Sequence, residues 1–141
     1  MSYAGDITPL EAWKILTDNP RAVLVDVRTS AEWTFVGVPD LSSLGRDVVY
    51  IEWNTVDGGH NGNFLAELQE AIPPADGADE ERPVVFLCRS GNRSIGAAEA
   101  ATAAGIVPAY NVLDGFEGHP DADGHRGVAG WRAIGLPWRQ G

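Results

Sequence analysis

Three things are scarce in this sequence: cysteine, positive charge and long apolar runs. The 141 residues include one cysteine, Cys88, which excludes an internal disulfide framework and any zinc or iron–sulfur site built from several cysteines. Lysine and arginine together number 10 against 20 aspartates and glutamates, so the formal net charge is −10. A surface of this sign repels phosphate backbones and anionic lipid headgroups, and we therefore expect neither nucleic acid nor a membrane as a partner.

The chain also lacks the patterns of exported and membrane-spanning proteins. Its first residues, MSYAGDITPLEAW, contain no basic stretch followed by an apolar one, as a signal peptide would. No apolar run approaches the roughly 18–20 residues that cross a bilayer. Together with an unpaired cysteine, these absences predict a cytoplasmic protein. The length predicts a single domain over residues 1–141, and the sequence gives little indication of an oligomeric state.

Strand and helix signals alternate along the chain. Apolar runs rich in branched residues predict strands at 22–27, 48–53, 83–88 and 109–113. The runs at 22–27 and 83–88 are nearly continuous, which is typical of a sheet buried on both faces. This alternation predicts an α/β fold with a mainly parallel sheet of about five strands and helices on both faces.

The helix signals lie between these runs. Thr8-Pro9-Leu10-Glu11 and Thr29-Ser30-Ala31-Glu32 both have the capping-box pattern that starts a helix. Amphipathic or alanine-rich stretches predict further helices over 64–72 and 93–104. A last short helix turn is expected within WRAIGLPW, ending near Gly135.

The segment after the strand at 83–88 has the features of a reactive-cysteine site. Cys88 ends the strand and is followed by Arg-Ser-Gly-Asn-Arg-Ser and then by the expected helix. Sites in an open α/β sheet lie beyond the carboxyl ends of the strands. Loop amides turned inward at Gly91, the positive end of the helix dipole, Arg89 and Arg93 all favour an anion there. Such surroundings lower the pKa of a cysteine from ~8.5 to roughly 3.5–7.5, which favours a nucleophile over a small buried hydrophobe.

This loop resembles the active-site loop of the rhodaneses, the thiosulfate:cyanide-type sulfurtransferases. The residues that carry the resemblance are Cys88, Arg89, Ser90, Gly91, Asn92, Arg93 and Ser94. Three further segments are similar to other parts of the family: LVDVRTSAEW (24–33), NVLDGFEG (111–118) and GWRAIGLPW (130–138). The resemblance covers most of the chain and implies a rhodanese-like three-layer fold.

The resemblance also implies a reaction. Cys88 would take the outer sulfur of a small anionic donor such as thiosulfate and hold it as a persulfide. A thiophilic acceptor, which is cyanide, a thiol or a protein, would then remove it. The substrate would be bound by Arg89, Ser90, Gly91, Asn92, Arg93 and Ser94, with Arg89 contacting the anion and Arg93 closing the loop. No metal or organic cofactor is implied, because sulfur itself is the group carried.

The sequence departs from the family pattern in two places. Many relatives have Gly-His-Ile-Pro-Gly-Ala where this chain has Val-Gly-Val-Pro-Asp-Leu at 36–41. The segment 114–130 is longer than the simplest relatives need. Neither departure removes a catalytic group, but both leave the preference for donor and acceptor open.

Two other functions are alternatives. Cysteine-dependent phosphatases of the same fold have five residues between cysteine and arginine, because tetrahedral phosphate needs a wider ring of amides. Four residues separate Cys88 from Arg93, which favours sulfur over phosphate. A non-catalytic or redox-sensing interaction module is the second alternative, since domains of one fold can bind partners without turnover.

Three weaker candidates lie outside the loop. Asp26 and Arg28, near the end of the run at 22–27, are expected to form a structural salt bridge or a turn contact rather than to reach the site. His119 and His125, with the aspartates between them, lie in a short polar loop, so we expect a solvated segment there and not a metal site. Trp33 or the loop 54–63 could form a wall of the site.

Overall fold

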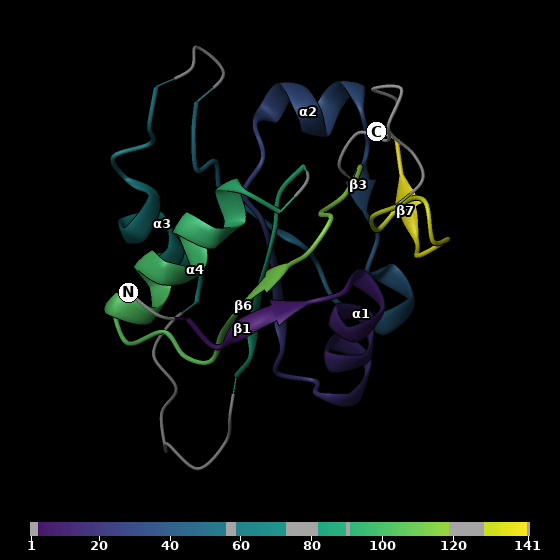
Figure 1. Cartoon of the computed structure of the whole chain (residues 1–141), viewed down its shortest axis with the longest axis horizontal. Coiled ribbons are helices and arrows are strands. Elements are labelled where there is room, and N and C mark those ends of the chain that lie inside the picture. Colours follow the sequence, from purple (N-terminus) through teal and green to yellow (C-terminus); the bar gives the residue numbers. More distant parts are fainter. Residues whose placement is uncertain (1–2, 56–58, 73–81, 90, 119–128, 141) are drawn as a thin grey trace.

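A five-stranded sheet, in which all neighbouring strands are parallel, forms the centre of the molecule (Figure 1). The computed structural model describes residues 3–55, 59–72, 82–89, 91–118 and 129–140. The strand order is β1-β6-β5-β2-β4, with β1 Gly5–Ile7, β2 Val23–Asp26, β4 Val49–Tyr50, β5 Val84–Leu87 and β6 Ala109–Val112. The central strand β5 is buried along its whole length, as its continuous apolar run predicts.

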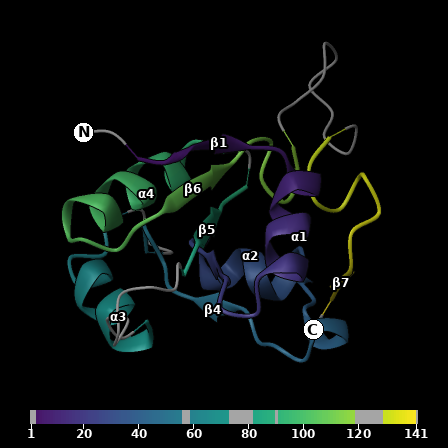
Figure 2. The same cartoon turned by 90° about the horizontal axis from the view of Figure 1, so that it is seen from below.

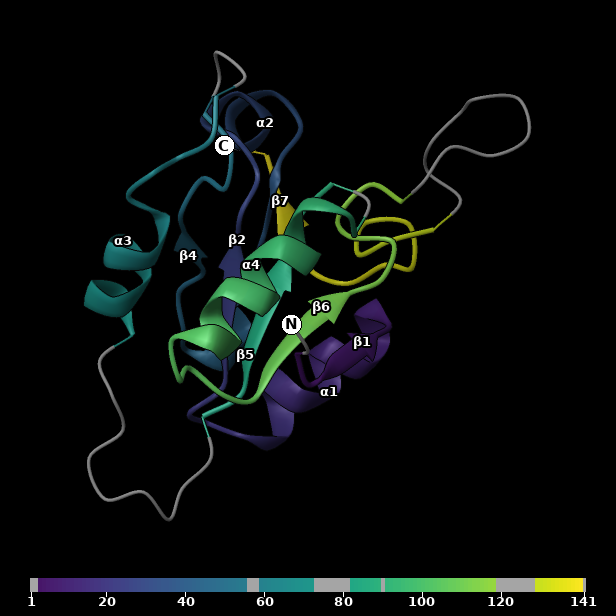
Figure 3. The ribbon, with the colours of Figure 1, turned by 60° about the vertical axis from the view of Figure 1, so that its left-hand side comes forward.

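Helices cover both faces of this sheet. They are α1 Pro9–Asp18, α2 Ser30–Phe35, α3 Phe64–Ala71 and α4 Arg93–Ala103. Helices α3 and α4 pack on one face and α1 packs on the other (Figures 2 and 3). Alternate residues of β5 point to opposite faces of the sheet and pack into two different cores. Phe86 packs with α3 and α4, whereas Val85 and Leu87 pack on the side of α1. The predicted three-layer α/β fold is therefore confirmed.

Both expected capping boxes are present and set the starts of α1 and α2. The side chains of Thr8 and Thr29 accept hydrogen bonds from the amides of Glu11 and Glu32. The two glutamate side chains in turn accept from the amides of the threonines. Each box satisfies two amides that a helix start would otherwise leave unpaired, so these local patterns predict the helix starts correctly.

Several short elements were not expected from the sequence. They are β1, the 3-10 helix Ser42–Leu44, and the strands β3 Val38–Pro39 and β7 Trp138–Arg139. Strands β3 and β7 form an antiparallel pair, with Val38 opposite Arg139 and Pro39 opposite Trp138. Elements of two or three residues are too short to show a hydrophobic period, which is why the sequence pattern does not indicate them.

Two predicted elements differ in the structure. The strand expected at 48–53 is reduced to Val49–Tyr50, although the amides of Ile51 and Trp53 still donate to the carbonyl groups of Asp26 and Val27. The helix turn expected in WRAIGLPW, ending near Gly135, is present only as hydrogen-bonded turns over 131–135 and not as a regular helix. The amide of Ile134 donates to the carbonyl group of Gly130 over 3.2 Å, and β7 follows at Trp138.

Candidate active site

The sulfur of Cys88 lies between the end of β5 and the start of α4. Its side chain is 1% exposed and packs among apolar residues on the α3–α4 side of the sheet. Two polar groups nevertheless donate hydrogen bonds to the sulfur: the amide of Gly91 over 3.1 Å and the hydroxyl of Ser94 over 3.2 Å. Donors aimed at a sulfur atom stabilise negative charge on it, whereas a cysteine that only fills space needs none.

Gly91 donates from a backbone conformation that favours glycine. Its φ angle is 98°, in the left-handed region. A Cβ atom at this position would lie 3.2 Å from the carbonyl oxygen of Val112 and 3.3 Å from the amide nitrogen of Asp114. Conformation and space therefore both favour glycine at the point where the loop turns its amide toward the sulfur.

The segment 114–118, which follows β6, holds the backbone of the cysteine loop. The amide of Phe116 donates to the carbonyl group of Cys88 over 2.8 Å, and the amide of Glu117 donates to that of Arg89 over 2.9 Å. Gly115 permits this close approach, because a Cβ there would lie 2.3 Å from the carbonyl oxygen of Cys88. The loop is thus fixed from outside as well as by its own hydrogen bonds.

Both arginines of the loop are paired with carboxylates. The two terminal nitrogens of Arg93 donate to the two carboxylate oxygens of Glu32 over 2.8 and 2.9 Å. The Nε atom of Arg89 lies 3.1 Å from Oε2 of Glu117, in an ion pair without hydrogen-bond geometry. The positive charge expected around the thiol is therefore offset by Glu32 and Glu117. Negative charge on the sulfur is therefore stabilised mainly by dipoles, which are those of an amide, a hydroxyl and the helix N-terminus.

The pKa values of Glu32 and Arg93 are both shifted by their pairing. Burial raises the pKa of Glu32, but hydrogen bonds from Arg93 and from the Thr29 amide, with the charges of the nearby arginines, outweigh burial and lower it. The hydrogen bond to Glu32 raises the pKa of Arg93 against the effect of burial, and the charge of the same carboxylate raises it further. Both groups therefore stay ionised near neutral pH.

The expected salt bridge between Asp26 and Arg28 is confirmed. Arg28 Nη2 lies 2.6 Å from Asp26 Oδ2, and both side chains are fully buried. The same nitrogen donates to the carbonyl group of Gly37 over 2.8 Å. The guanidinium lies over the ring of Phe116, 4.3 Å from its centroid, and so supports the segment that holds the cysteine loop.

The remaining predicted residues are placed as follows. Asn92 is exposed at the N-cap of α4 and its side chain makes no capping hydrogen bond. Trp33 packs edge-on against Tyr50, with ring centroids 5.2 Å apart. Ser90, His119 and His125 lie outside the described residues, as does most of the segment 114–130.

The described residues contain neither a metal-binding cluster nor a membrane-spanning helix. Across the described ranges, no group of three or more histidine, cysteine, aspartate or glutamate side chains is placed to hold a metal ion. In the same part of the chain, no helix is long and apolar enough to cross a membrane.

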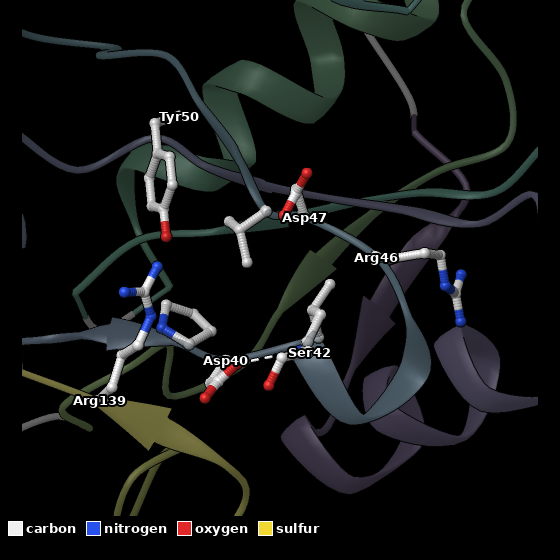
Figure 4. A pocket seen from close by; sticks show the side chains of 9 residues that line it. Asp40, Ser42, Arg46, Asp47, Tyr50 and Arg139 are labelled. Atoms are coloured by element: carbon white, nitrogen blue, oxygen red, sulfur yellow. Dashed lines mark hydrogen bonds between the residues drawn. The ribbon is translucent and has the colours of Figure 1, made fainter.

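A separate hollow of about 550 Å³ lies beside β3 and β7 (Figure 4). It is lined by Pro39, Asp40, Leu41, Ser42, Arg46, Asp47, Val48, Tyr50 and Arg139, and no residue of the cysteine loop is among them. In Figure 4 the hydroxyl of Tyr50 and the guanidinium of Arg139 point toward each other. The lining carries two acidic and two basic side chains and no nucleophilic sulfur. This hollow is therefore not part of the cysteine site.

Comparisons with known proteins point to one family. The family model of the rhodanese-like domain matches residues 8–119. "Uncharacterized protein RC0915" of Rickettsia conorii is 35% identical over 134 residues, which are 95% of this chain and 96% of that protein. The thiosulfate sulfurtransferase GlpE of Actinobacillus pleuropneumoniae is 25% identical over 94% of this chain and 90% of its own length.

Two solved structures are also similar. The crystal structure of Rv0390 from M. tuberculosis is 76% identical, with a TM-score of 0.91 over 99% of this chain and 100% of that one. The solution structure of a polysulfide-sulfur transferase homodimer from Wolinella succinogenes is 25% identical, with a TM-score of 0.59 over 96% of this chain and 78% of that one.

Proposed function

Because the chain belongs to the rhodanese-like domain family, we propose that it is a sulfurtransferase that carries sulfane sulfur on Cys88. The observation that carries the proposal is the pair of hydrogen bonds to the cysteine sulfur, from Gly91 over 3.1 Å and from Ser94 over 3.2 Å. These donors and the N-terminus of α4 form a cradle for one negatively charged sulfur atom. Relatives named as a thiosulfate sulfurtransferase and a polysulfide-sulfur transferase support the same chemistry.

In the first step, the thiolate of Cys88 attacks the outer sulfur of a donor such as thiosulfate. A bond forms between this sulfur and the cysteine, the bond between the two sulfur atoms of thiosulfate breaks, and sulfite leaves with the electron pair. The Gly91 amide and the Ser94 hydroxyl stabilise the charge on Cys88 before the attack. Cys88 is 1% exposed, so the donor must present a slender reactive end, and a terminal sulfur atom meets this requirement.

In the second step, cyanide or a thiolate acceptor attacks the outer sulfur of the persulfide. The new bond to the acceptor forms as the bond to the Cys88 sulfur breaks, and the thiolate of Cys88 is regenerated with the electron pair. The two donors that stabilised the starting thiolate stabilise it again as a leaving group. Electrons balance over the two steps without an external oxidant or reductant.

The pairing of Arg93 supports sulfur transfer over phosphate hydrolysis. A phosphatase arginine must offer two of its N–H groups to two phosphate oxygens. In this chain both terminal nitrogens of Arg93 donate to the carboxylate of Glu32. The loop between Cys88 and Arg93 is also one residue shorter than the loop of the phosphatases.

The test compares wild-type protein with Cys88→Ser in three measurements. These are thiocyanate formation from thiosulfate and cyanide, the intact mass after thiosulfate treatment, and hydrolysis of an aryl phosphate. We expect the wild type to form thiocyanate and to gain the mass of one sulfur atom, and the variant to do neither. Phosphate hydrolysis without sulfur uptake would support the phosphatase. No sulfur uptake from thiosulfate or polysulfide and no hydrolysis would support the interaction module.

A further inference from the structure

A polar network leads from Ser94 to the edge of the sheet. The Ser94 side chain hydrogen-bonds to Oδ1 of Asn111 as well as to the sulfur of Cys88. Nδ2 of Asn111 donates to Oδ1 of Asp6 over 3.0 Å, and the hydroxyl of Tyr3 donates to the same oxygen over 2.6 Å. Ser94 and Asn111 are fully buried, whereas Asp6 is exposed. Since Asp6 and Asn111 are register partners in β1 and β6, the network connects the edge strand with the reactive sulfur.

Asp6 fixes the orientation of the Asn111 side chain. A carboxylate only accepts hydrogen bonds, so the NH₂ group of Asn111 must face Asp6 and its carbonyl oxygen must face Ser94. The hydrogen bond from Tyr3, followed by the one from Asn111, lowers the pKa of Asp6. Asp6 therefore stays ionised near neutral pH, and it keeps the donor side of the amide turned away from Ser94.

Ser94 has one hydroxyl proton and two acceptors beside it. When Cys88 is a thiol, its proton can go to the Ser94 oxygen while Ser94 donates to Asn111, so every group has a partner. When Cys88 is a thiolate, Ser94 donates to the sulfur, and the buried carbonyl oxygen of Asn111 loses that donor. An unpaired buried acceptor is unfavourable, and this shifts the equilibrium toward the thiol.

We propose that Asp6 is a positioning residue for Cys88: by holding the Asn111 carbonyl group against Ser94, it makes Asn111 compete with the cysteine sulfur for the Ser94 proton. While Cys88 carries no extra sulfur, this competition disfavours its thiolate form. Once sulfur is loaded, the negative charge lies on the outer sulfur of the persulfide and the Ser94 proton returns to Asn111. This last step rests on the proposed function, whereas the competition in the unloaded protein does not.

The effect of Asp6 is separable from that of other groups near Cys88. Charged or titratable side chains on the elements around the cysteine loop include Asp26, Arg28, Glu32, Arg89, Arg93, Glu99, Tyr110, Asp114 and Glu117. All of them are retained when Asp6 is replaced. A change in the pH dependence of Cys88 on replacing Asp6 therefore reports on Asp6 and on the amide that it orients.

The test is the pH dependence of Cys88 alkylation by iodoacetamide, which needs no sulfur donor. In Asp6→Ala the Asn111 amide is free to turn its NH₂ group to Ser94, which leaves the Ser94 proton to the sulfur. We expect the pH midpoint of the rate to fall by up to about one unit, which is a gain of up to about tenfold in rate below the midpoint. Asn111→Val removes the competing carbonyl without a change of charge and should shift the midpoint the same way. Ser94→Ala removes the donor and should shift it upward.

Loss of the Asp6 charge itself favours a thiolate, so a charge control is needed. Glu99→Gln on α4 serves this purpose, because the charges of Glu99 and Asp6 both act on Tyr3. A midpoint in Asp6→Ala that rises, stays unchanged or falls no further than in Glu99→Gln overturns the proposal. If Asn111→Val fails to fold, the exposed Asp6→Ala variant together with Ser94→Ala still decides.

The outcome is independent of the sulfur-transfer assay. A shifted midpoint in a protein that takes up no sulfur from thiosulfate or polysulfide would refute the proposed function and leave the positioning role of Asp6 standing. An active enzyme whose midpoint does not respond to Asp6→Ala would leave the function standing and refute the positioning role.

Discussion

Arg93 and Glu32 form a two-point ion pair between positions that are 61 residues apart in the sequence, with N–O distances of 2.8 and 2.9 Å. The pair joins the first residue of α4, where the cysteine loop ends, to the first turn of α2. Glu32 also accepts the amide hydrogen of Thr29 in the capping box. One carboxylate therefore orders both the start of α2 and the end of the cysteine loop.

Replacing Glu32 by glutamine should separate these two roles. Glutamine can keep the capping box, but it leaves the half-buried guanidinium of Arg93 without a negative partner. We expect the free energy of unfolding to fall by about 1–3 kcal/mol, between the effects of breaking an exposed and a buried pair. Urea unfolding measures this change. The matched control is Glu11→Gln, at the same capping-box position of α1. Equal losses in the two variants would show that the pairing with Arg93 adds no stability.

The lowered pKa of Glu32 defines the pH range over which the ion pair stabilises the folded protein. In the unfolded chain the carboxyl group has its ordinary pKa of 4.5, whereas in the folded protein it takes up its proton only at lower pH. Its contribution is complete above the unfolded value and is lost as the pH falls through the folded one. The stability difference between wild type and Glu32→Gln should therefore hold from about pH 7 to about pH 5 and then shrink on further acidification. Denaturant unfolding across this range is the measurement, and a difference that grows in acid contradicts the assignment.

The part of the fold that the sequence predicts is the part encoded by neighbouring residues. The capping boxes at Thr8 and Thr29 each lie within four positions, and the buried strand β5 is one continuous apolar run. Each pattern carries its own physical cause, so it can be identified without knowledge of the rest of the chain. Strands β3 and β7 have two residues each. They form because two segments that are far apart in the sequence meet in the fold, and no local pattern encodes this meeting.

The residues of the candidate site also differ in whether the local sequence predicts them. Cys88, Gly91 and the start of α4 follow from the sequence of the loop. The partners Glu32, Glu117 and Asn111 do not, since their contacts with the loop depend on how distant segments come together. The capping box does identify Glu32, but as a helix cap and not as the partner of Arg93. The balance of charge around the sulfur is therefore the property of the site that the sequence alone predicts least well.

The Arg89–Glu117 pair predicts an effect on donor binding. Glu117 is nearly buried, whereas the Arg89 side chain is 47% exposed and held by it. Replacing Glu117 by glutamine should free Arg89 to meet the anionic end of thiosulfate. We expect the KM for thiosulfate to fall by up to about fivefold, the fold-change that corresponds to about 1 kcal/mol for a solvent-accessible ion pair, with little change in kcat. Steady-state kinetics of thiocyanate formation measure both constants.

A control is needed for the change in net charge. Glu70→Gln on α3 removes the same charge from an exposed position of that helix. If KM falls equally in both variants, the effect belongs to overall charge and not to Arg89. A KM that rises in Glu117→Gln would show that the pair holds Arg89 in its binding position.

Gly91→Ala tests whether the amide at this position stabilises the sulfur charge. The new Cβ would lie 3.2 Å from the carbonyl oxygen of Val112 at a φ of 98°, so we expect the loop to shift and the Gly91 amide to move away from the sulfur. Gly105→Ala is the matched control, because its φ is 84° but no atom lies within 4 Å of the added Cβ. Both variants should lose about 1–2 kcal/mol of stability through left-handed strain. Only Gly91→Ala should also lose thiocyanate formation and rapid alkylation of Cys88, by about tenfold or more. If Gly91→Ala kept the rates of Gly105→Ala, the amide would have no part in stabilising the thiolate, and the proposed mechanism would rest on Ser94 and the helix N-terminus alone.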